Sequence, residues 1–326
     1  MAIEIADLTT LYSAQTTVDV RENAVWPMLT NRMWEGELTS AYKVVIQDPT
    51  YNTKPKARTR GADFQASDEV SSDQIELIVT NEVEQNTRFD YEDIPEAPIE
   101  WLARTRMSQA LSLMTEDGDT AAGDSINTSL YRAMTGSTFA NAQKRTFGTD
   151  ATDFISRNAS NNYAGTGRGY GLLTDAITAV DIYIQRANQR GSTIGGSVGE
   201  PVVVMAPELF AGYRQYLLEQ KYYFEAVNSA IFSNGSILSG ERFMGKIFGI
   251  NFMTSNRYSV PTGNGDWKLH MFTPNCFAFA MKPPYVQILA PGVNQNGPHW
   301  RLIQINRWAI KEINDAFKFE ITVKAD

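Results

Sequence analysis

One segment of the sequence nearly matches a phosphate-binding loop. Residues 240–247 read Gly-Glu-Arg-Phe-Met-Gly-Lys-Ile, with two glycines and a lysine at the spacing of that motif. The motif also needs a Ser or Thr after the lysine to ligate magnesium, and a helix that begins there. Ile247 has no hydroxyl group and opens an apolar run that is typical of a strand. The segment therefore predicts glycine turns between strands rather than a nucleotide site.

A second glycine-rich segment, residues 165–171, precedes an expected helix and superficially suggests a dinucleotide site. The third glycine of that fingerprint would fall at Tyr170, and no strand leads into the segment. A dinucleotide site needs a strand, the glycine turn and a helix in that order. We therefore expect a flexible loop here.

Metal ligands and nucleophiles are sparse. The chain has two histidines, His270 and His299, and one cysteine, Cys276, and their spacing offers no paired metal ligands. No Gly-x-Ser-x-Gly turn singles out a nucleophilic serine. We expect no catalytic residue, no metal site and no cofactor. A single cysteine in an apolar run also excludes an intrachain disulfide and fits a reducing compartment.

The composition is that of a globular protein with an acidic surface. The chain has 326 residues, of which 43% are hydrophobic and 20% charged, and a net charge of -8. This length allows one large domain or two smaller ones, and the negative charge disfavours electrostatic binding of nucleic acid. No signal peptide is evident, and apolar runs of about six residues are too short to span a bilayer. We expect a cytoplasmic protein without a membrane segment.

An extended hairpin is the first element that the sequence predicts. Residues 37–47 predict a strand with one face formed by Leu38, Tyr42, Val44 and Ile46. A turn-rich tip follows, and the return limb is first basic and then acidic before a strand at 75–80. Because a two-stranded ribbon is marginally stable alone, this one would have to lie on another surface, such as a neighbouring subunit. A disordered surface loop is the alternative.

The rest of the chain predicts a mixed α+β fold. Helical spacing of apolar residues predicts a long helix from Pro98 to about residue 119 and a second helix at 172–190. A loop is expected at 136–171. A short buried strand at 201–205 precedes a helix at 208–219, with Pro207 at its start. Further strands are expected at 247–254, 267–273, 276–281, 285–289, 300–306 and 316–324.

The last of these strands alternates most regularly. One face is apolar and consists of Phe317, Phe319, Ile321 and Val323. The other face is polar and consists of Lys318, Glu320, Thr322 and Lys324. Such alternation predicts a strand with one buried face and one face in solvent.

Two segments and the order of the elements carry a resemblance to a known family. The first is Val-Val-Val-Met-Ala-Pro at 202–207 with the helix after it, and the second is Gly-Lys-Ile-Phe-Gly-Ile-Asn-Phe-Met-Thr-Ser-Asn at 245–256. With the arm, hairpin and long helix before them, they resemble the major capsid proteins of tailed bacteriophages, which have the Hong Kong 97-type shell fold. The resemblance covers nearly the whole chain.

The resemblance implies a division of the chain into named parts. These are an N-terminal arm at 1–34, an extended loop at 35–75, a peripheral domain at 76–204 with a spine helix at about 98–119, an axial domain at 205–281, and a return to the peripheral domain at 282–326. Arms and extended loops of this family lie over neighbouring subunits. The intersubunit contact residues expected on this basis are Trp26, Tyr42, Lys54, Lys56, Arg58, Arg60, Asp63 and Glu69.

The function implied by the resemblance is that of a major capsid protein. It would form pentamers and hexamers of an icosahedral shell around double-stranded DNA, without sequence-specific DNA binding. Its partners would be its own copies, a separate scaffolding protein, a portal and a decoration protein, and it would lie in the virion capsid after assembly in the host cytoplasm. No partner asparagine can be matched to the hairpin lysines, so we expect no covalent crosslink.

Two alternatives stay open from the sequence. An encapsulin-type nanocompartment shell protein would have the same fold and would enclose an enzyme cargo. A β-rich carbohydrate-binding or hydrolytic domain would explain the aromatic residues and strands, and it would expose tryptophans beside carboxylates.

Overall fold

The computed structural model describes the chain in thirteen segments. They are residues 26–39, 41–50, 71–90, 126–140, 143–147, 167–188, 199–219, 241–247, 249–259, 261, 266–289, 299–314 and 317–323. The expected spine helix at about 98–119 lies outside the described residues. So do residues 1–25 of the expected arm.

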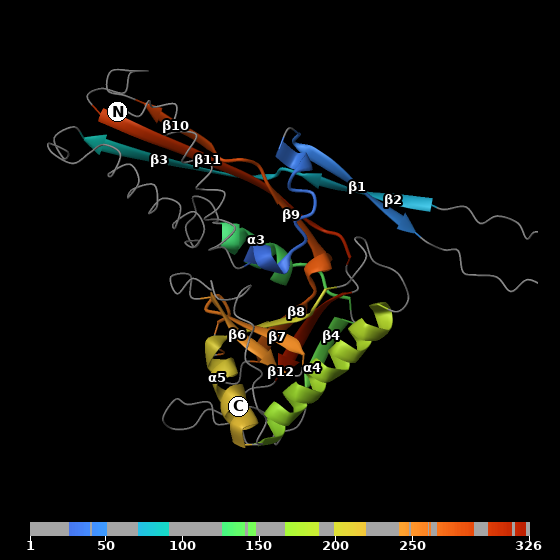
Figure 1. Ribbon diagram of the computed structural model, residues 1–326. Helices are drawn as coiled ribbons and strands as arrows, with labels where there is room; N and C mark the ends of the chain where they lie inside the picture. The colour runs from blue at the N-terminus through green and yellow to red at the C-terminus, as the bar shows by residue number, and fades with distance from the viewer. Residues whose placement is uncertain are drawn as a thin grey trace, which may run out of the picture.

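A two-stranded antiparallel ribbon projects from one side of the molecule (Figure 1). It pairs β1 (Lys43–Thr50) with β2 (Ser71–Ile78). The strand expected at 37–47 therefore begins later, because Glu37–Thr39 form a 3-10 turn, η2. Leu38, Val44 and Ile46 are buried as expected, whereas Tyr42 is 59% exposed and does not share their face.

The ribbon is continuous with a sheet built around one long strand. This strand, β11 (His299–Glu312), pairs along one side with β3 (Asn81–Asp90). Along its other side it pairs first with β10 (Tyr285–Leu289) and then with β9 (Phe277–Met281). The strand expected at 300–306 is longer than predicted because three partners satisfy its backbone along its whole length.

A second sheet has six strands in the order β4-β12-β8-β5-β7-β6. The bounds of these strands are β4 (Lys144–Phe147), β5 (Val202–Met205), β6 (Glu241–Ile247), β7 (Ile250–Ser255), β8 (Trp267–Phe272) and β12 (Lys318–Val323). The pairs β12–β4 and β5–β7 are parallel and the others antiparallel. Strand β4 lies where a loop was expected, so that expectation was wrong there.

Helices cover both faces of the six-stranded sheet (Figure 1). On one face lie α4 (Gly167–Asn188) and α5 (Pro207–Glu219), and towards the other sheet lie η1 (Trp26–Leu29) and α3 (Ile126–Thr135). The α4 stripe predicted to be buried is buried, namely Leu173, Ile177, Val180 and Ile184. The loop expected at 165–171 was wrong from Gly167 onward, and α3 was not predicted. Among the described helices, none is long and apolar enough to cross a membrane.

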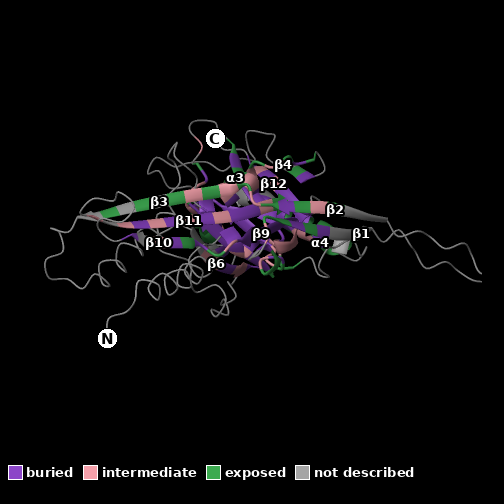
Figure 2. Ribbon diagram, turned by 90° about the horizontal axis from the view of Figure 1, so that it is seen from above, coloured by how far each residue is buried: buried purple, intermediate pink, exposed green. Residues whose placement is uncertain are grey.

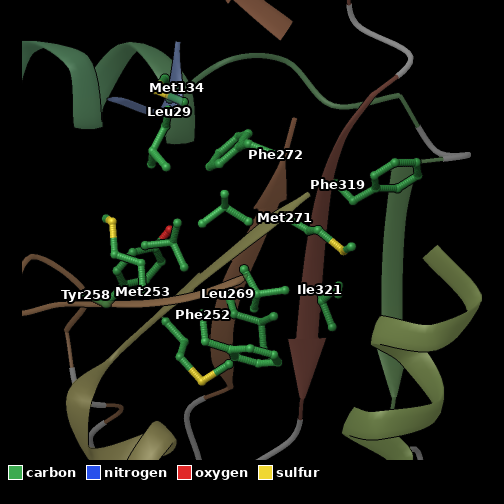
Figure 3. Close-up of a cluster of buried hydrophobic side chains, with 14 of the residues drawn as sticks. Leu29, Met134, Phe252, Met253, Tyr258, Leu269, Met271, Phe272, Phe319 and Ile321 are labelled. Atoms are coloured by element: carbon green, nitrogen blue, oxygen red, sulfur yellow. The ribbon is translucent and has the colours of Figure 1, made fainter. Parts of the chain in front are cut away.

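Buried residues gather in the middle of the molecule (Figure 2). The main core lies on both sides of this sheet (Figure 3). Leu29 and Met134 approach from η1 and α3 on the side of Phe272, while Met271 and Phe319 face α4 and α5 (Figure 3). Tyr183 of α4 meets the Phe319 ring edge-on, with centroids 5.4 Å apart. The sheet is therefore a middle layer with apolar side chains packed on both faces.

The polar face predicted for the last strand is only partly exposed. Phe319, Ile321 and Val323 are buried as expected, but Lys318 is also buried, with 1% of its surface exposed. Phe139 lies over it, with the Lys318 Nζ atom 5.1 Å from the ring centroid. The expectation for Lys318 was wrong because residues 136–140, far away in sequence, cover this face.

Strand pairing does not follow the domain ranges that the resemblance implied. Strand β12, from the range expected to return to the peripheral domain, pairs with β8 from the range expected to be axial. Strand β9, also from the axial range, pairs with β11. The domain boundaries stay a prediction.

A matched pair of methionines tests the core. We expect Met271→Ala to lower the free energy of unfolding by about 2–5 kcal/mol, because Met271 is fully buried and its loss leaves a cavity. Met33→Ala should change it by less than about 0.5 kcal/mol, because Met33 is 66% exposed. Urea unfolding of both variants measures the difference. Equal losses would contradict the assigned core.

Candidate functional site

The segment that resembled a phosphate-binding loop is a strand. Residues 241–247 form β6, and a β-bulge between Phe243 and Gly245 accommodates Gly245 at a φ of 136°. The Lys246 Nζ atom lies 2.9 Å from one carboxylate oxygen of Glu200, and the other carboxylate oxygen accepts a hydrogen bond from Asn251. These hydrogen bonds, that of Lys246 first, lower the pKa of Glu200. Gly245 therefore lies in a bulge within a strand and not in a turn between strands, and Ile247 ends β6 instead of opening a strand, so both expectations were wrong. Gly240 lies outside the described residues. Lys246 belongs to a surface ion pair.

The three candidate metal ligands lie in three different elements. His270 lies in β8, Cys276 ends the 3-10 turn η5 (Pro274–Cys276), and His299 begins β11. Within the described segments, no three His, Cys, Asp or Glu side chains come together in a way that could hold a metal ion.

His270 is a buried core residue with polar partners. Its Nδ1 atom lies 2.8 Å from the Tyr258 hydroxyl, and its Nε2 atom lies 3.8 Å from the Glu320 carboxylate, which is beyond hydrogen-bond length. Its ring stacks on Phe272 and contacts Phe139. Burial lowers the pKa of His270, and the Glu320 carboxylate opposes that shift. The environment therefore holds the imidazole neutral.

Cys276 lies where the chain crosses between the two sheets. Its thiol donates to the carbonyl of Phe317 over 2.8 Å, and its own carbonyl accepts from the backbone of Ile313 and Asn314. The backbone N–H of Thr273 donates to the same Phe317 carbonyl. Complete burial raises the pKa of the Cys276 thiol to about 12. A thiol in this state is not a nucleophile. Its hydrogen bond to Phe317 instead joins two segments of the chain that pass between the sheets.

Of the expected contact residues, the structure describes only Trp26 and Tyr42. Trp26 is fully buried against Tyr131, with ring centroids 5.4 Å apart, and its backbone N–H donates to Asn127. The Trp26 side chain is thus packed in the core of its own chain. Tyr42 is exposed, and the Lys282 Nζ atom lies 3.7 Å from the centroid of its ring. Lys54, Lys56, Arg58, Arg60, Asp63 and Glu69 lie outside the described residues, so their contact role stays a prediction.

The ribbon has an outward face that the sequence analysis missed. Val45 and Ile78 are each 43% exposed, although both are apolar. The pairing register puts them on the same side as Lys43 and Glu76, which form an ion pair across the ribbon. The inward residues Val44, Ile46 and Leu77 pack on Ala278, Ala280 and Ala309. The strand alternation at positions 43–46 could have identified this second apolar face.

Tryptophan burial weighs against the carbohydrate-binding alternative. Such sites expose tryptophans, whereas the four whose burial the structure describes, Trp26, Trp34, Trp267 and Trp308, are buried. Trp101 and Trp300 are outside that set. Trp308 also donates to Ser129 of α3. These side chains stabilise the core.

Comparison with known proteins identifies the fold. No family model matches the sequence, and no curated protein matches it. Among solved structures, the capsid of cyanophage P-SCSP1u is similar over 94% of this chain and 89% of its own, with a TM-score of 0.54 at 10% identity. The capsid of Ralstonia phage GP4 is similar over 95% and 93%, with a TM-score of 0.52 at 12% identity.

A structure from Mycobacterium phage Che8 is similar over 92% of this chain and 91% of its own, with a TM-score of 0.51 at 14% identity. The expected mixed α+β fold of phage capsid proteins is therefore confirmed.

The state of His270 predicts a pH dependence of stability. Below about pH 6.5 the unfolded chain takes up a proton at this residue, while the folded chain, with its lowered pKa, does not. The contribution of neutral His270 to the free energy of unfolding is therefore fully present above about pH 6.5. The free energy of unfolding should fall as the pH is lowered, by up to about 1.4 kcal/mol per pH unit from this group. Urea unfolding at a series of pH values measures the slope.

Two variants serve as test and control. His270→Phe should reduce the slope below about pH 6.5, and His299→Gln should keep the His270 contribution. An unchanged slope in His270→Phe would contradict the assignment.

Proposed function

We propose that this chain is a major capsid protein that forms pentamers and hexamers of a closed icosahedral shell around double-stranded DNA. The observation that supports the proposal is the likeness to phage capsids over 94% and 95% of the chain. A partial likeness could reflect a shared sheet, but this one covers nearly the whole chain.

The ribbon is the part best suited to join neighbouring copies. Its base is fixed to the subunit by Leu38, Val44 and Leu77, while its far end projects from the body (Figure 1). Eight residues per strand give a reach of about 26 Å, and twenty further residues connect the strands. In the proposed shell this ribbon and the connecting segment lie over the adjacent subunit, where Lys54, Lys56, Arg58 and Arg60 are contact residues.

The exposed apolar side chains of the ribbon fit the same role. Exposed apolar groups lie beside charged ones here, as at protein interfaces that form only after folding. The Lys43–Glu76 pair lies on the same side as Val45 and Ile78, and Lys282 lies at the Tyr42 ring. Their burial by a second copy would remove them from water and add to the assembly free energy.

The shell role accounts for the charge. With a net charge of -8, the wall of the proposed shell would not bind tightly the DNA that is packed against it. The proposed partners are other copies of the chain, a scaffolding protein, a portal and a decoration protein. The proposed place is the virion capsid, after assembly in the host cytoplasm, and the proposed role is structural rather than enzymatic.

Sedimentation velocity and electron microscopy of the purified protein, with and without its scaffold, test this proposal. We expect pentamers, hexamers or closed particles of tens of nanometres. A chain that stays monomeric at high concentration under all these conditions would contradict the proposal. Particles that contain a protein cargo and exclude DNA would favour the nanocompartment alternative.

Deletion of residues 48–60 tests the ribbon separately. We expect a folded subunit that forms no closed shell, because the pairs from Lys43 to Gln47 still anchor the base but the reach to a neighbour is lost. A control replaces the same residues with a Gly/Ser segment of equal length, which keeps the loop and removes its side chains. Circular dichroism checks folding and electron microscopy checks assembly. Normal particles from the deletion variant would exclude an intersubunit role for the hairpin.

A further inference from the structure

We infer that the open edge of β3 is a docking surface for residues 54–60 of a second copy of this chain, which pair with it as an antiparallel strand. The inference rests on the proposed function. It names the place on a neighbouring subunit that receives the segment connecting the two strands of the ribbon.

Strand β3 is a long edge strand. It ends the sheet order β10-β11-β3, so among the described strands none pairs with its other side. Its ten residues include no proline or lysine, and they pair with β11 without a register shift. Proteins protect sheet edges against strand addition by short length, bulges, proline or charge, and β3 has only charge. That charge excludes a strand of like charge and admits a complementary one.

The even-numbered residues of β3 direct their backbone groups to the open edge. On the far side of β11, the carbonyl of Arg307 accepts from Lys282, so the odd-numbered residues of β11 bond away from β3. Because backbone groups alternate in direction along a strand, the even-numbered residues of β11 bond towards β3. Those residues lie opposite odd-numbered residues of β3, as Asn306 does opposite Val83. The even-numbered residues of β3 are therefore the ones that an added strand would meet.

These outward residues also carry the acidic side chains of the edge. Glu82 and Glu84 are both exposed. Glu82 accepts two hydrogen bonds from Arg307, whereas Glu84 has no ion-pair partner among the described residues. A cation opposite Glu84 on an added strand would form a cross-strand ion pair.

Residues 54–60 supply cations with the matching period. Their sequence is Lys-Pro-Lys-Ala-Arg-Thr-Arg, so every second side chain is cationic. In an extended strand these four side chains lie on one face. An antiparallel register with Lys56 opposite Glu84 also brings Arg58 opposite Glu82.

Pro55 selects the antiparallel direction. Opposite residues of an antiparallel pair can bond to each other, so Lys54 and Lys56 would bond to β3 and the Pro55 nitrogen would face away. In a parallel pair with the same cations over the glutamates, the odd-numbered residues would have to bond, and Pro55 has no N–H to donate. The antiparallel register also places Asn52 opposite Arg88, so that no cation faces Arg88.

The segment cannot reach β3 of its own chain. Lys54 follows Thr50 by four residues, which is a reach of about 13 Å. Thr50 lies opposite Ser71 at the far end of the ribbon, and β2 spans about 23 Å from there to the base. Strand β3 then runs further away from the ribbon (Figure 1). The occupant of the edge is therefore a second copy.

Disulfide formation between two variants tests the pairing. Chains with Glu84→Cys and chains with Lys56→Cys are assembled together with the scaffold and oxidised, and non-reducing gels measure linked dimers. Bonded opposite residues have Cα atoms about 5.5 Å apart, which a disulfide can span. We expect linked dimers from this mixture. The buried Cys276 is common to all the variants.

Ala57→Cys in place of Lys56→Cys is the matched control, because residue 57 would lie on the opposite face of the same strand. We expect at least about fivefold fewer linked dimers from the control mixture. Particles that form without the link, or with equal amounts from both mixtures, would overturn the inference and leave the proposed function standing. A chain that forms no pentamers, hexamers or particles would contradict both.

The double variant Glu84→Cys with Lys56→Cys tests whether the chain's own segment lies on the edge. Oxidised at high dilution before assembly, it should form no link within one chain. A link within the unassembled chain would overturn the inference, because the edge would then be occupied before a second copy arrives.

Discussion

The structure depends on the hydrogen-bonded crossing between its two sheets. Backbone groups buried at such a place need partners, and here the two crossings supply them to each other at Cys276 and Phe317. Because the chain crosses here, the six-stranded sheet can bury both of its faces against helices while the four-stranded sheet carries the ribbon. An inert, buried thiol suits this position because it is small and can still donate a hydrogen bond.

The ribbon in turn depends on small residues in the four-stranded sheet. Ala278, Ala280 and Ala309 leave room for the larger inward side chains of the ribbon and of η2, which pack closely over them. This packing fixes the base of the ribbon without using its outward face. The ribbon therefore has a packed base and partly exposed outward side chains at Val45 and Ile78, as the proposed contact with another copy requires.

The sequence predicted the elements whose pattern is local. The buried strand before Pro207, the stripe of α4 and the apolar face of the last strand are confirmed because burial there follows from spacing alone. Helix α3 was missed because Asn127, Thr128 and Ser129 mask its apolar spacing. The burial of Lys318 could not be predicted, because it results from residues 136–140, which are brought over it by the fold. Nor could spacing alone distinguish buried Trp26 from exposed Tyr42, since exposure depends on partners distant in sequence.

Crosslinking of particles assembled from equal amounts of ¹⁴N-labelled and ¹⁵N-labelled chains tests the central claim that the ribbon joins neighbouring copies. If the account is correct, mass spectrometry will find crosslinks from Lys43, Lys54 or Lys56 that combine one light and one heavy peptide. Crosslinks from these lysines that always pair two light or two heavy peptides would contradict it, because the ribbon would then contact only its own chain.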